Sequence, residues 1–450
     1  MMKYNFLKRA TTSGFFLIIS LFLFMLFMSS CNEAIEEEIC SEVIWYLDAD
    51  SDGLGDPNSS ISSCDQPEGF VSNANDEDDS SQQNDEEPTN VLEAIIQFFA
   101  GVIDPDNLQN YENQPVPNYI QEDNTEGNLI TDEGATLGRV LFYDKNLSID
   151  NTVSCASCHK QEFAFGDDAQ LSEGVNGVTG RHSMRLVNAR FSDEERFFWD
   201  ERANTLEEQT TLPIQDHVEM GFSGENGDPD INDLITKLDT LDYYQGLFTM
   251  AFGDSEITEE RMQNAMAQFV RSIQSFDSRF DEGLAQVNNI NQDFPNFTAV
   301  ENQGKTLYMT APNDGGAGCQ TCHGAPEFDI DDDSDNNGVI GVAGDPNAID
   351  LDVTRSPTLR DLFNSEGQLN GPLMHDGSFT SFEAVLAHYN DISVDPRNDN
   401  LDNRLRGGRG GNGQNLNLDD EEVEAIVAFV KTLSGSDVYT NEKWSDPFQD

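Results

Sequence analysis

Two stretches of the chain space their apolar residues as an amphipathic helix does. Residues 258–280, "TEERMQNAMAQFVRSIQSFDSRF", repeat apolar side chains at steps of three and four, at Met262, Met266, Phe269, Ile273, Phe276 and Phe280. Residues 418–435, "LDDEEVEAIVAFVKTLSG", do the same at Ile426, Phe429, Val430 and Leu433. Such steps gather side chains on one helix face. We therefore predict two core helices, the first capped by Thr258 and the second ended by Gly435.

An internal repeat extends this pattern to the scale of domains. "LGRVLFYD", from Leu137, and "QGKTLYMT", from Gln303, each contain a glycine, a basic residue and an apolar helical stretch. Each is followed at a similar distance by a C-x-x-C-H pentapeptide. Long alternations of apolar and polar residues are absent, so the fold class predicted is mainly α. The repeat predicts two related domains, residues 91–290 and 291–450.

Residues 1–30 have the pattern of an export signal. An apolar run over residues 15–28 follows Lys3, Lys8 and Arg9, and it is shorter than a membrane span. The run ends in "MSSC", which resembles a bacterial lipoprotein lipobox and so implies cleavage before Cys31 and lipid on its thiol. An uncleaved N-terminal anchor is the alternative. Either way we expect the mature chain outside the cytoplasm and tethered to a membrane. With lipid on Cys31, we expect it in the cell envelope, lipid-anchored to the outer membrane and facing periplasm or cell surface.

The charge of the chain limits its partners. There are 24 Lys and Arg residues against 84 Asp and Glu, a formal net charge of −60. Nucleic acid is excluded as a partner, because neutralising its phosphates requires clustered basic residues. The acidity favours a solvated surface with bound cations or a basic protein partner.

Residues 31–90 are predicted to be an acidic tether with one small module. "DADSDGLGDP" sets carboxylates around a turn at Gly53, a pattern that suits a hard cation such as calcium, at Asp48, Asp50, Asp52 and Asp56. It is no EF-hand, because Ser59 holds the twelfth position, and it resembles a thrombospondin type 3 calcium repeat. A plain acidic turn is the alternative. The stretch that follows, residues 75–88, has no apolar pattern and is predicted to be disordered.

The two pentapeptides, "CASCH" and "CQTCH", have the pattern of c-type haem attachment sites. Two thiols three positions apart can form thioethers to one haem, with the adjacent histidine as proximal iron ligand. We therefore predict two covalently bound haem c groups, held by Cys155, Cys158 and His159 and by Cys319, Cys322 and His323. One zinc site shared by both motifs and a dithiol redox pair are the alternatives. Cys40 and Cys64 are then left to form a disulfide in an oxidising compartment.

The segment from 197 to 220, "FFWDERANTLEEQTTLPIQDHVEM", offers chemistry for the far side of a haem. It contains Trp199, Gln209 and Glu219. A carboxylate near a haem can shuttle the proton needed to split a peroxide O–O bond. In so acidic a chain, a solvated surface charge is the competing interpretation of Glu219.

Five motifs together resemble the bacterial di-haem cytochrome c peroxidase and MauG family. They are "LGRVLFYD", "SCASCH", "FWDERA…EEQ…P…VEM", "RSPTLRD" and "MHDGSF", collinear over about residues 130 to 435. The resemblance implies two cytochrome c-like domains, a peroxide-binding N-terminal haem and an electron-transfer C-terminal haem. It further implies Glu219 as acid/base, Gln209 beside it, and Trp199 as electron relay between the haems. Calcium between the domains, a homodimer, and a small cytochrome or cupredoxin as electron donor are implied as well.

Some residues depart from that family pattern. Many members carry a distal histidine where this chain has "GVNG", residues 174–177, so the peroxidatic iron is expected to be open without reductive activation. His182 stands where the family has a calcium-binding asparagine, although Asn370 and Pro372 match other calcium donors. His182 is also an alternative distal ligand. His217 has no family counterpart and is interpreted as a surface or haem-edge histidine.

The sixth ligand of the C-terminal haem is predicted by a count. Family peroxidases place a methionine fourteen residues after the histidine of "HDG", and MauG-type members place a tyrosine there. Counting from His375 reaches Tyr389. Met374 and Met309 are further candidates off that position.

The helical periodicity around Tyr389 also favours this residue as the ligand. "TSFEAVLAHYN", residues 380–390, opens with a Thr380–Glu383 capping box. An inward stripe is then predicted for Phe382, Val385, Leu386 and Tyr389. His388 is rotated off that face by ~100°. A tyrosine packed in the core is the alternative, and His388 is the less favoured ligand.

The sequence thus predicts a haem oxidoreductase that reduces hydrogen peroxide. A Tyr389-ligated haem would make it resemble the MauG type, without the methylamine pathway being implied. A non-catalytic electron-transfer lipoprotein or redox sensor is the alternative from another class. A calcium-dependent surface adhesin accounts for the acidic module but not for the haem motifs.

Overall fold

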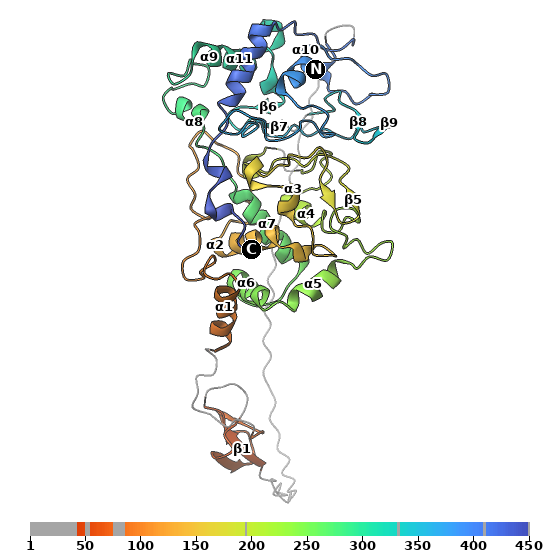
Figure 1. Ribbon diagram of the computed structural model, residues 1–450. Helices are drawn as coiled ribbons and strands as arrows, with labels where there is room; N and C mark the ends of the chain where they lie inside the picture. The colour runs from red at the N-terminus through yellow and green to blue at the C-terminus, as the bar shows by residue number, and fades with distance from the viewer. Residues whose placement is uncertain are drawn as a thin grey trace, which may run out of the picture. The chain divides into compact units, whose positions relative to one another are not determined.

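A computed structural model describes residues 43–49, 55–74, 86–193, 196–330, 334–407 and 411–448. The chain divides into two compact units, Met1–Gln83 and Asn84–Asp450. Figure 1 shows the helices of the second unit gathered in two lobes, one with α2 to α7 and one with α8 to α11. Helices dominate the regular structure of the described residues.

The first unit contains a small antiparallel sheet with strand order β2-β1-β3. Its strands are β1 (Val43–Leu47), β2 (Ser60–Ser63) and β3 (Phe70–Val71). The acidic turn predicted to bind calcium joins β1 to β2, and there the Asp56 carboxylate accepts a hydrogen bond from the Asn58 backbone N–H at 2.7 Å. Cys64 is disulfide-bonded.

Several predictions for the N-terminal part lie outside the described residues. These are the signal segment 1–30, lipidated Cys31, the disulfide partner Cys40, and the calcium ligands Asp50 and Asp52. Within the described residues, none of the helices has both the length and the apolar character to cross a membrane.

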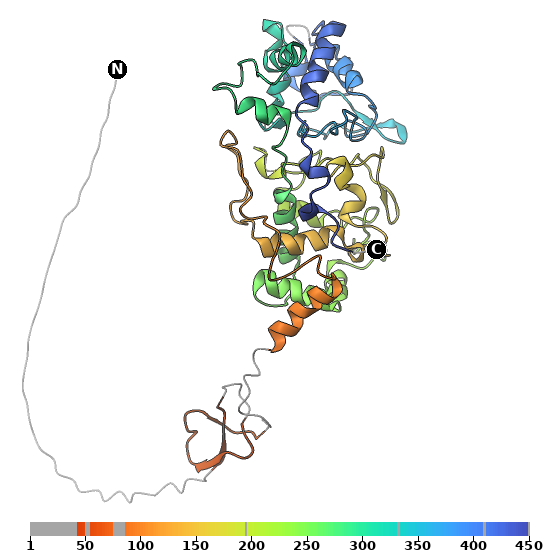
Figure 2. The same ribbon diagram turned by 60° about the vertical axis from the view of Figure 1, so that its left-hand side comes forward.

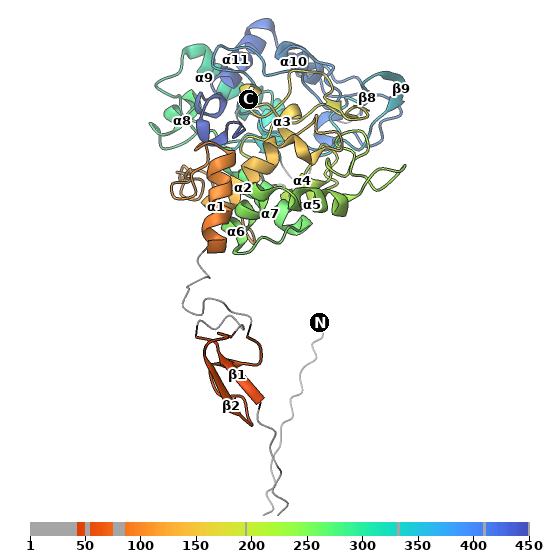
Figure 3. The same cartoon turned by 60° about the horizontal axis from the view of Figure 1, so that its bottom comes forward.

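The prediction of disorder up to residue 88 is wrong at its end. Helix α1 (Glu86–Phe98) begins inside that stretch, and residues 75–85 lie outside the described part. Ile95 and Phe99 are fully or almost fully buried, and α1 lies beside α6 (Asp242–Phe252) (Figures 2 and 3). Burial of this apolar face stabilises α1 despite the acidic residues before it. Local composition alone does not reveal that burial.

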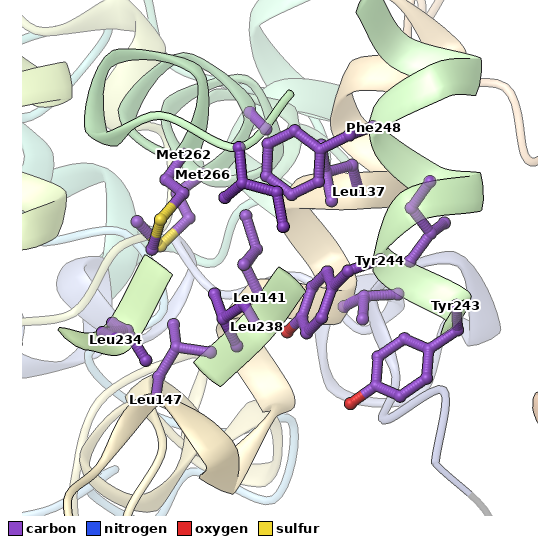
Figure 4. Packing of buried hydrophobic residues seen from close by; sticks show 14 of the residues in the cluster. Leu137, Leu141, Leu147, Leu234, Leu238, Tyr243, Tyr244, Phe248, Met262 and Met266 are labelled. Carbon is purple, nitrogen blue, oxygen red and sulfur yellow. The ribbon is translucent and has the colours of Figure 1, made fainter. Parts of the chain in front are cut away.

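The first lobe is built on two crossing helices, α2 (Asp132–Tyr143) and α7 (Glu259–Ser272). Thr258 caps α7, as predicted, by accepting a hydrogen bond from the Arg261 N–H. Figure 4 shows the core between them, where Leu137 and Leu141 lie near Met262 and Met266.

Helix α7 is shorter than its apolar pattern. It ends at Ser272, and Phe280 belongs to a separate helix, α8 (Arg279–Leu284). The reason is a competing set of hydrogen bonds, because Asn188 donates its N–H to the Ile273 carbonyl and its side chain accepts from the Ser275 N–H. The apolar spacing continues beyond Ser272 because the segment that connects α7 to α8 also faces the core.

The second lobe repeats the crossing with α9 (Ala299–Met309) and α11 (Asp420–Lys431), and α10 (Phe382–Asn390) packs beside them. Helix α11 ends before the predicted stop, with Thr432 as its C-cap. The backbone N–H of Gly435 instead donates to the Asp361 carboxylate at 2.9 Å.

The remaining elements are short and carry much of the site. They are α3 (Cys155–Cys158), α4 (Leu206–Thr211), α5 (Ile231–Asp239), β4 (Glu173–Gly174), β5 (Gly177–Val178), β6 (His323–Gly324), β7 (Asp329–Ile330), β8 (Gly341–Val342) and β9 (Asp345–Ile349). The C-terminal residues return to the first lobe (Figure 1), where the Trp444 carbonyl accepts a hydrogen bond from the Tyr143 hydroxyl at 2.7 Å.

The repeated glycine lies where the two helices of each pair bring their backbones into close contact. A Cβ on Gly138 of α2 would lie 2.0 Å from the Ala265 carbonyl oxygen of α7. A Cβ on Gly304 of α9 would lie 1.8 Å from the Ala425 carbonyl oxygen of α11. The internal repeat of the sequence is therefore also a repeat of helix packing, with backbone against backbone at the same position.

We expect Gly138→Ala and Gly304→Ala each to lower the free energy of unfolding by ~1–3 kcal/mol, because the methyl group has no room beside a backbone carbonyl. Urea denaturation followed by circular dichroism measures the effect. Gly180→Ala is the control, since its added Cβ meets no atom within 4 Å. Wild-type stability of both crossing variants would contradict the packing argument.

Candidate active site

A cavity of about 560 Å³ in the first lobe is lined by the first C-x-x-C-H motif. Helix α3 carries Cys155 and Cys158, and Ser154 and Ser157 form a reciprocal capping box at its start. Both thiols and the His159 ring therefore reach the same cavity from one short helix.

The first histidine is oriented by its backbone partner. The Nδ1 atom of His159 lies 3.1 Å from the Phe165 carbonyl oxygen, and burial lowers the pKa of the ring. A neutral imidazole that donates from Nδ1 leaves Nε2 with a free lone pair, which is what a metal ligand requires.

A second cavity, of about 550 Å³, is lined by the other motif. Cys319, Cys322 and His323 reach it, and burial lowers the pKa of His323 to about 4. The Tyr308 hydroxyl donates to the His323 carbonyl at 2.6 Å and so anchors the motif to α9. This histidine is also neutral at physiological pH.

The donor chemistry of both cavities fits covalent haem. The motifs line different cavities, so a single zinc site closed by both does not form, and no three His, Cys, Asp or Glu of the described residues group as a metal site. Burial raises the pKa of Cys155 and of Cys319 to about 12. A dithiol redox pair needs the opposite shift. Paired thiols beside a neutral histidine in a largely apolar cavity suit thioether-linked haem c.

Glu219 lines the first cavity together with His159. Burial raises the pKa of Glu219 to about 7, the Asp216 carboxylate adds to the shift, and Arg202 opposes it. Asp216 accepts hydrogen bonds from the Val218 and Glu219 backbone N–H groups, at 2.7 and 3.0 Å. Glu219 is therefore no solvated surface charge, and it can both give and take a proton near neutral pH.

The "GVNG" segment, which lacks a histidine, lies behind Glu219. It forms the β4–β5 hairpin, and the Val175 N–H donates to the Glu219 carbonyl at 3.0 Å. A Cβ on Gly174 would lie 2.2 Å from the Val218 carbonyl oxygen. The hairpin thus holds the backbone of the carboxylate, and only Gly174 of this segment lines the cavity.

Gln209 lines the first cavity, and Trp199 lines both. The Trp199 indole N–H donates to the His182 carbonyl at 2.7 Å, and its backbone carbonyl accepts from the Thr354 and Arg355 N–H groups. The indole is therefore held at the boundary of the two cavities.

The two unassigned histidines differ in their surroundings. His182 also lines both cavities, but its Nδ1 lies 3.0 Å from the Ala169 carbonyl oxygen and 3.2 Å from that of Gln170. His217 is half exposed and pairs with Asp228 at 2.6 Å, as expected of a surface histidine. His182 as a distal ligand stays a prediction.

Tyr389 lines the second cavity with Cys322 and His323. Burial raises its pKa, and the Cys322 sulfur acts in the same direction. Phe382, Val385 and Leu386 are buried as the helical phase predicted, whereas His388 points away and its Nε2 contacts the Asn337 carbonyl at 2.9 Å.

The predicted capping box of that helix is wrong. Ser381 caps α10, because its side chain accepts from the Ala384 N–H. Of the other candidate ligands, Met374 lines the cavity with its sulfur 3.4 Å from the Asn337 amide nitrogen, and Met309 packs in the core beside it.

The predicted calcium donors, Asn370 and Pro372, differ in their surroundings. Asn370 is buried and its amide donates to the Asp361 carbonyl and the Tyr439 hydroxyl, both at 2.8 Å. Pro372 lines the cavity. Calcium here stays a prediction.

Two residues near the cavities were not singled out from the sequence. Asp216 raises the pKa of Glu219, and Arg185 lines both cavities. Asp216 precedes Glu219 by three residues in a turn, a spacing that offers a weak signal. Nothing in the residues around Arg185 indicates its place.

The known proteins that this chain is similar to include di-haem cytochrome c peroxidases and MauG proteins. A family model described as di-haem cytochrome c peroxidase matches residues 132–289. Methylamine utilization protein MauG of Methylophilus methylotrophus is 29% identical over 315 residues, covering 68% of this chain and 84% of that protein. Cytochrome c551 peroxidase of Nitrosomonas europaea is 28% identical over 315 residues, covering 67% and 80%.

Solved structures share the fold. A MauG-like protein associated with microbial copper homeostasis has a TM-score of 0.58 at 27% identity, covering 74% of this chain and 99% of that one. The diheme peroxidase BthA from Burkholderia thailandensis has a TM-score of 0.52 at 23% identity, over 75% of this chain and 90% of that one. The second likeness bears on the fold alone.

The raised pKa of Glu219 predicts a pH effect on stability. Folded Glu219 releases its proton near pH 7, whereas the unfolded carboxyl does so at the ordinary value of about 4.5. The folded state binds more protons in that interval, so the free energy of unfolding should fall with rising pH relative to Glu219→Gln. Urea denaturation of both proteins between about pH 4 and about pH 8 measures this difference. Parallel pH curves would contradict the shift.

Proposed function

We propose that this cytochrome-c-peroxidase-like oxidoreductase reduces hydrogen peroxide, a function supported by its similarity to the di-haem cytochrome c peroxidase and MauG family. Haems held by Cys319, Cys322 and His323 and by Cys155, Cys158 and His159 would allow electrons to pass from the second site to the first. The observation that carries this proposal is a carboxyl with a pKa of about 7, Glu219, in the cavity of the first C-x-x-C-H motif. Bound haem supplies the iron at which peroxide is reduced.

Glu219 is the acid and base of this reaction. Reducing peroxide to water consumes protons at the oxygen that leaves, and a group with a pKa near the working pH serves both as donor and as acceptor. Its neighbours in the cavity fit that role, because Arg202 opposes the effect of burial and keeps the pKa from rising further. Gln209 lines the same cavity and offers a neutral amide to orient the substrate.

Trp199 carries electrons between the cavities. Its indole borders both of them, and the hydrogen bond to the His182 carbonyl restrains its orientation. The side chain is largely buried, at 9% exposure. A rigid aromatic ring that borders both sites shortens the path that an electron would otherwise take through saturated chain.

We assign Tyr389 as the sixth ligand of the second haem, which would make the protein MauG-like. The hydroxyl faces a cavity whose burial opposes loss of its proton, so the phenolate needs a nearby cation such as ferric iron to be stable. An anionic oxygen ligand stabilises oxidised iron, whereas methionine raises the potential. Such a haem would store oxidising equivalents and accept electrons poorly from ordinary small cytochromes.

The location of the protein, its electron donor and its calcium sites are proposed from the sequence. The protein is anchored by lipid at Cys31 to the outer membrane and faces periplasm or cell surface. Its electron donor is a small cytochrome or cupredoxin, and the net charge of −60 favours a basic face on that partner. Calcium at Asn370 and Pro372 and in the N-terminal repeat, and a homodimer, complete the proposal.

Glu219→Gln should lower the rate of peroxide reduction by about 10²–10⁴-fold, because the amide cannot exchange a proton with the substrate. Stopped-flow absorbance of the haem bands after mixing with peroxide measures the rate. Glu173→Gln, a change of an exposed carboxylate in β4, is the matched control and should react as the wild type does. Haem content and electron uptake from a chemical reductant should stay unchanged in both variants.

If wild-type protein does not turn over peroxide with any donor while electron uptake persists, the proposal fails. The alternative, an electron-transfer lipoprotein or redox sensor, would then account for the haem cavities. Equal peroxide rates in Glu219→Gln and wild type would reject the assigned acid and base while leaving the peroxidase open.

Tyr389→Met should raise the reduction potential of the second haem and change its low-temperature EPR spectrum, because a neutral thioether replaces an anionic oxygen. His388→Gln is the matched control from the same helix, since His388 bonds the Asn337 carbonyl instead of facing the cavity. An unchanged potential and spectrum in Tyr389→Met would reject ligation by this tyrosine.

A further inference from the structure

The two cavities share one wall. Four consecutive residues, 182–185, line both of them, together with Trp199, Arg355 and Pro357. Two members of this wall, Arg185 and Arg355, carry a positive charge. A charge placed there acts on both cavities at once.

The two arginines differ in their partners. Arg355 is held by the protein, because its guanidinium donates to the Ser192 hydroxyl at 2.6 Å and lies 3.7 Å from the Asp329 carboxylate. Arg185 makes a single side-chain hydrogen bond within the described residues, from Nη2 to the Thr358 carbonyl at 2.9 Å. No described carboxylate forms an ion pair with Arg185, and its buried Nε has no partner.

A buried guanidinium without an ion pair among the described residues is costly, and Tyr439 and Asp361 favour its charge without outweighing the burial. Burial lowers the pKa of Arg185, yet arginine stays protonated in proteins. Removing a charged group from water without a paired counter-charge is strongly unfavourable. Because Arg185 lines both cavities, a group bound in them can supply a paired counter-charge, and the remaining N–H donors suit planar carboxylates.

Haem c carries two propionate carboxylates, and each cavity has the thiols and histidine to hold one haem. We propose that Arg185 is a carboxylate-binding residue for the cofactors, pairing with a propionate of the haem in each cavity and raising the reduction potentials of both. This rests on the two-haem part of the proposed function but not on peroxide chemistry. Arg185 is thus a positioning residue that couples the electrostatics of the two haems.

The expected change in the two reduction potentials depends on which cavity each arginine lines. A nearby cation favours the reduced haem, since reduction lowers the positive charge of the iron. Arg202 lines only the first cavity and is paired with Asp200 at 2.8 Å. Arg404 lines only the second and is paired with Asp402 at 2.8 Å. These two arginines are matched controls for a charge that acts on one site.

Spectroelectrochemical titration of the full-length two-haem protein, without peroxide, tests the proposal. Arg185→Gln should shift both midpoint potentials to lower values, whereas Arg185→Lys should keep them near those of the wild type. Arg202→Gln should lower only the first potential and Arg404→Gln only the second. A shift of one potential, or of neither, in Arg185→Gln would overturn the proposal.

A second measurement keeps the test decisive if Arg185→Gln does not accumulate with two haems. Resonance Raman spectra of the wild type and Arg185→Lys report the propionate bending modes. Lysine retains the charge but not the fork of donors, so these modes should shift. Unchanged modes mean that Arg185 does not bind propionate. Because no peroxide is used, failure of the peroxidase function and failure of this inference give different results.

Discussion

The close contact of two helix pairs, made possible by a glycine in each, is the constraint on which the rest of the molecule depends. At Gly138 and at Gly304 the backbone of one helix rests against a carbonyl of the other. These crossings form the two cores, and each core supports the cavity next to its C-x-x-C-H motif. Both glycines stand at the same place in the internal repeat, so one packing solution was used twice.

The two cavities share a common wall, and the proposed function depends on it. Residues 182–185 and Trp199 line both cavities, so a substitution there alters the surroundings of both. The cavities differ in what else lines them, because Glu219 lines the first and Tyr389 the second. The proposed roles of the two sites differ accordingly, with a carboxyl for proton exchange in the first and a phenol for iron ligation in the second.

Sequence patterns succeeded where the relevant physics is local and failed where distant groups compete. The Thr258 cap and the orientation of His388 followed from spacing within one helix. The end of α7 did not, because Asn188, more than eighty residues away, takes over the hydrogen bonds of the next residues. The cap of α10 was assigned one residue early, since Thr380 and Ser381 are equally suited chemically and only the backbone selects Ser381.

The sequence by itself determined that two thiols and a histidine line one cavity in each lobe, since within five residues they need only one helical turn to do so. It also determined the two-lobe plan, because the repeat carries its own crossing glycine. Only the tertiary structure decided that Glu219 is buried with a pKa of about 7, that Trp199 borders both cavities, and that Arg185 forms no ion pair with a carboxylate of the described residues. Burial and electrostatic pairing depend on segments far apart in the chain, and no local pattern encodes them.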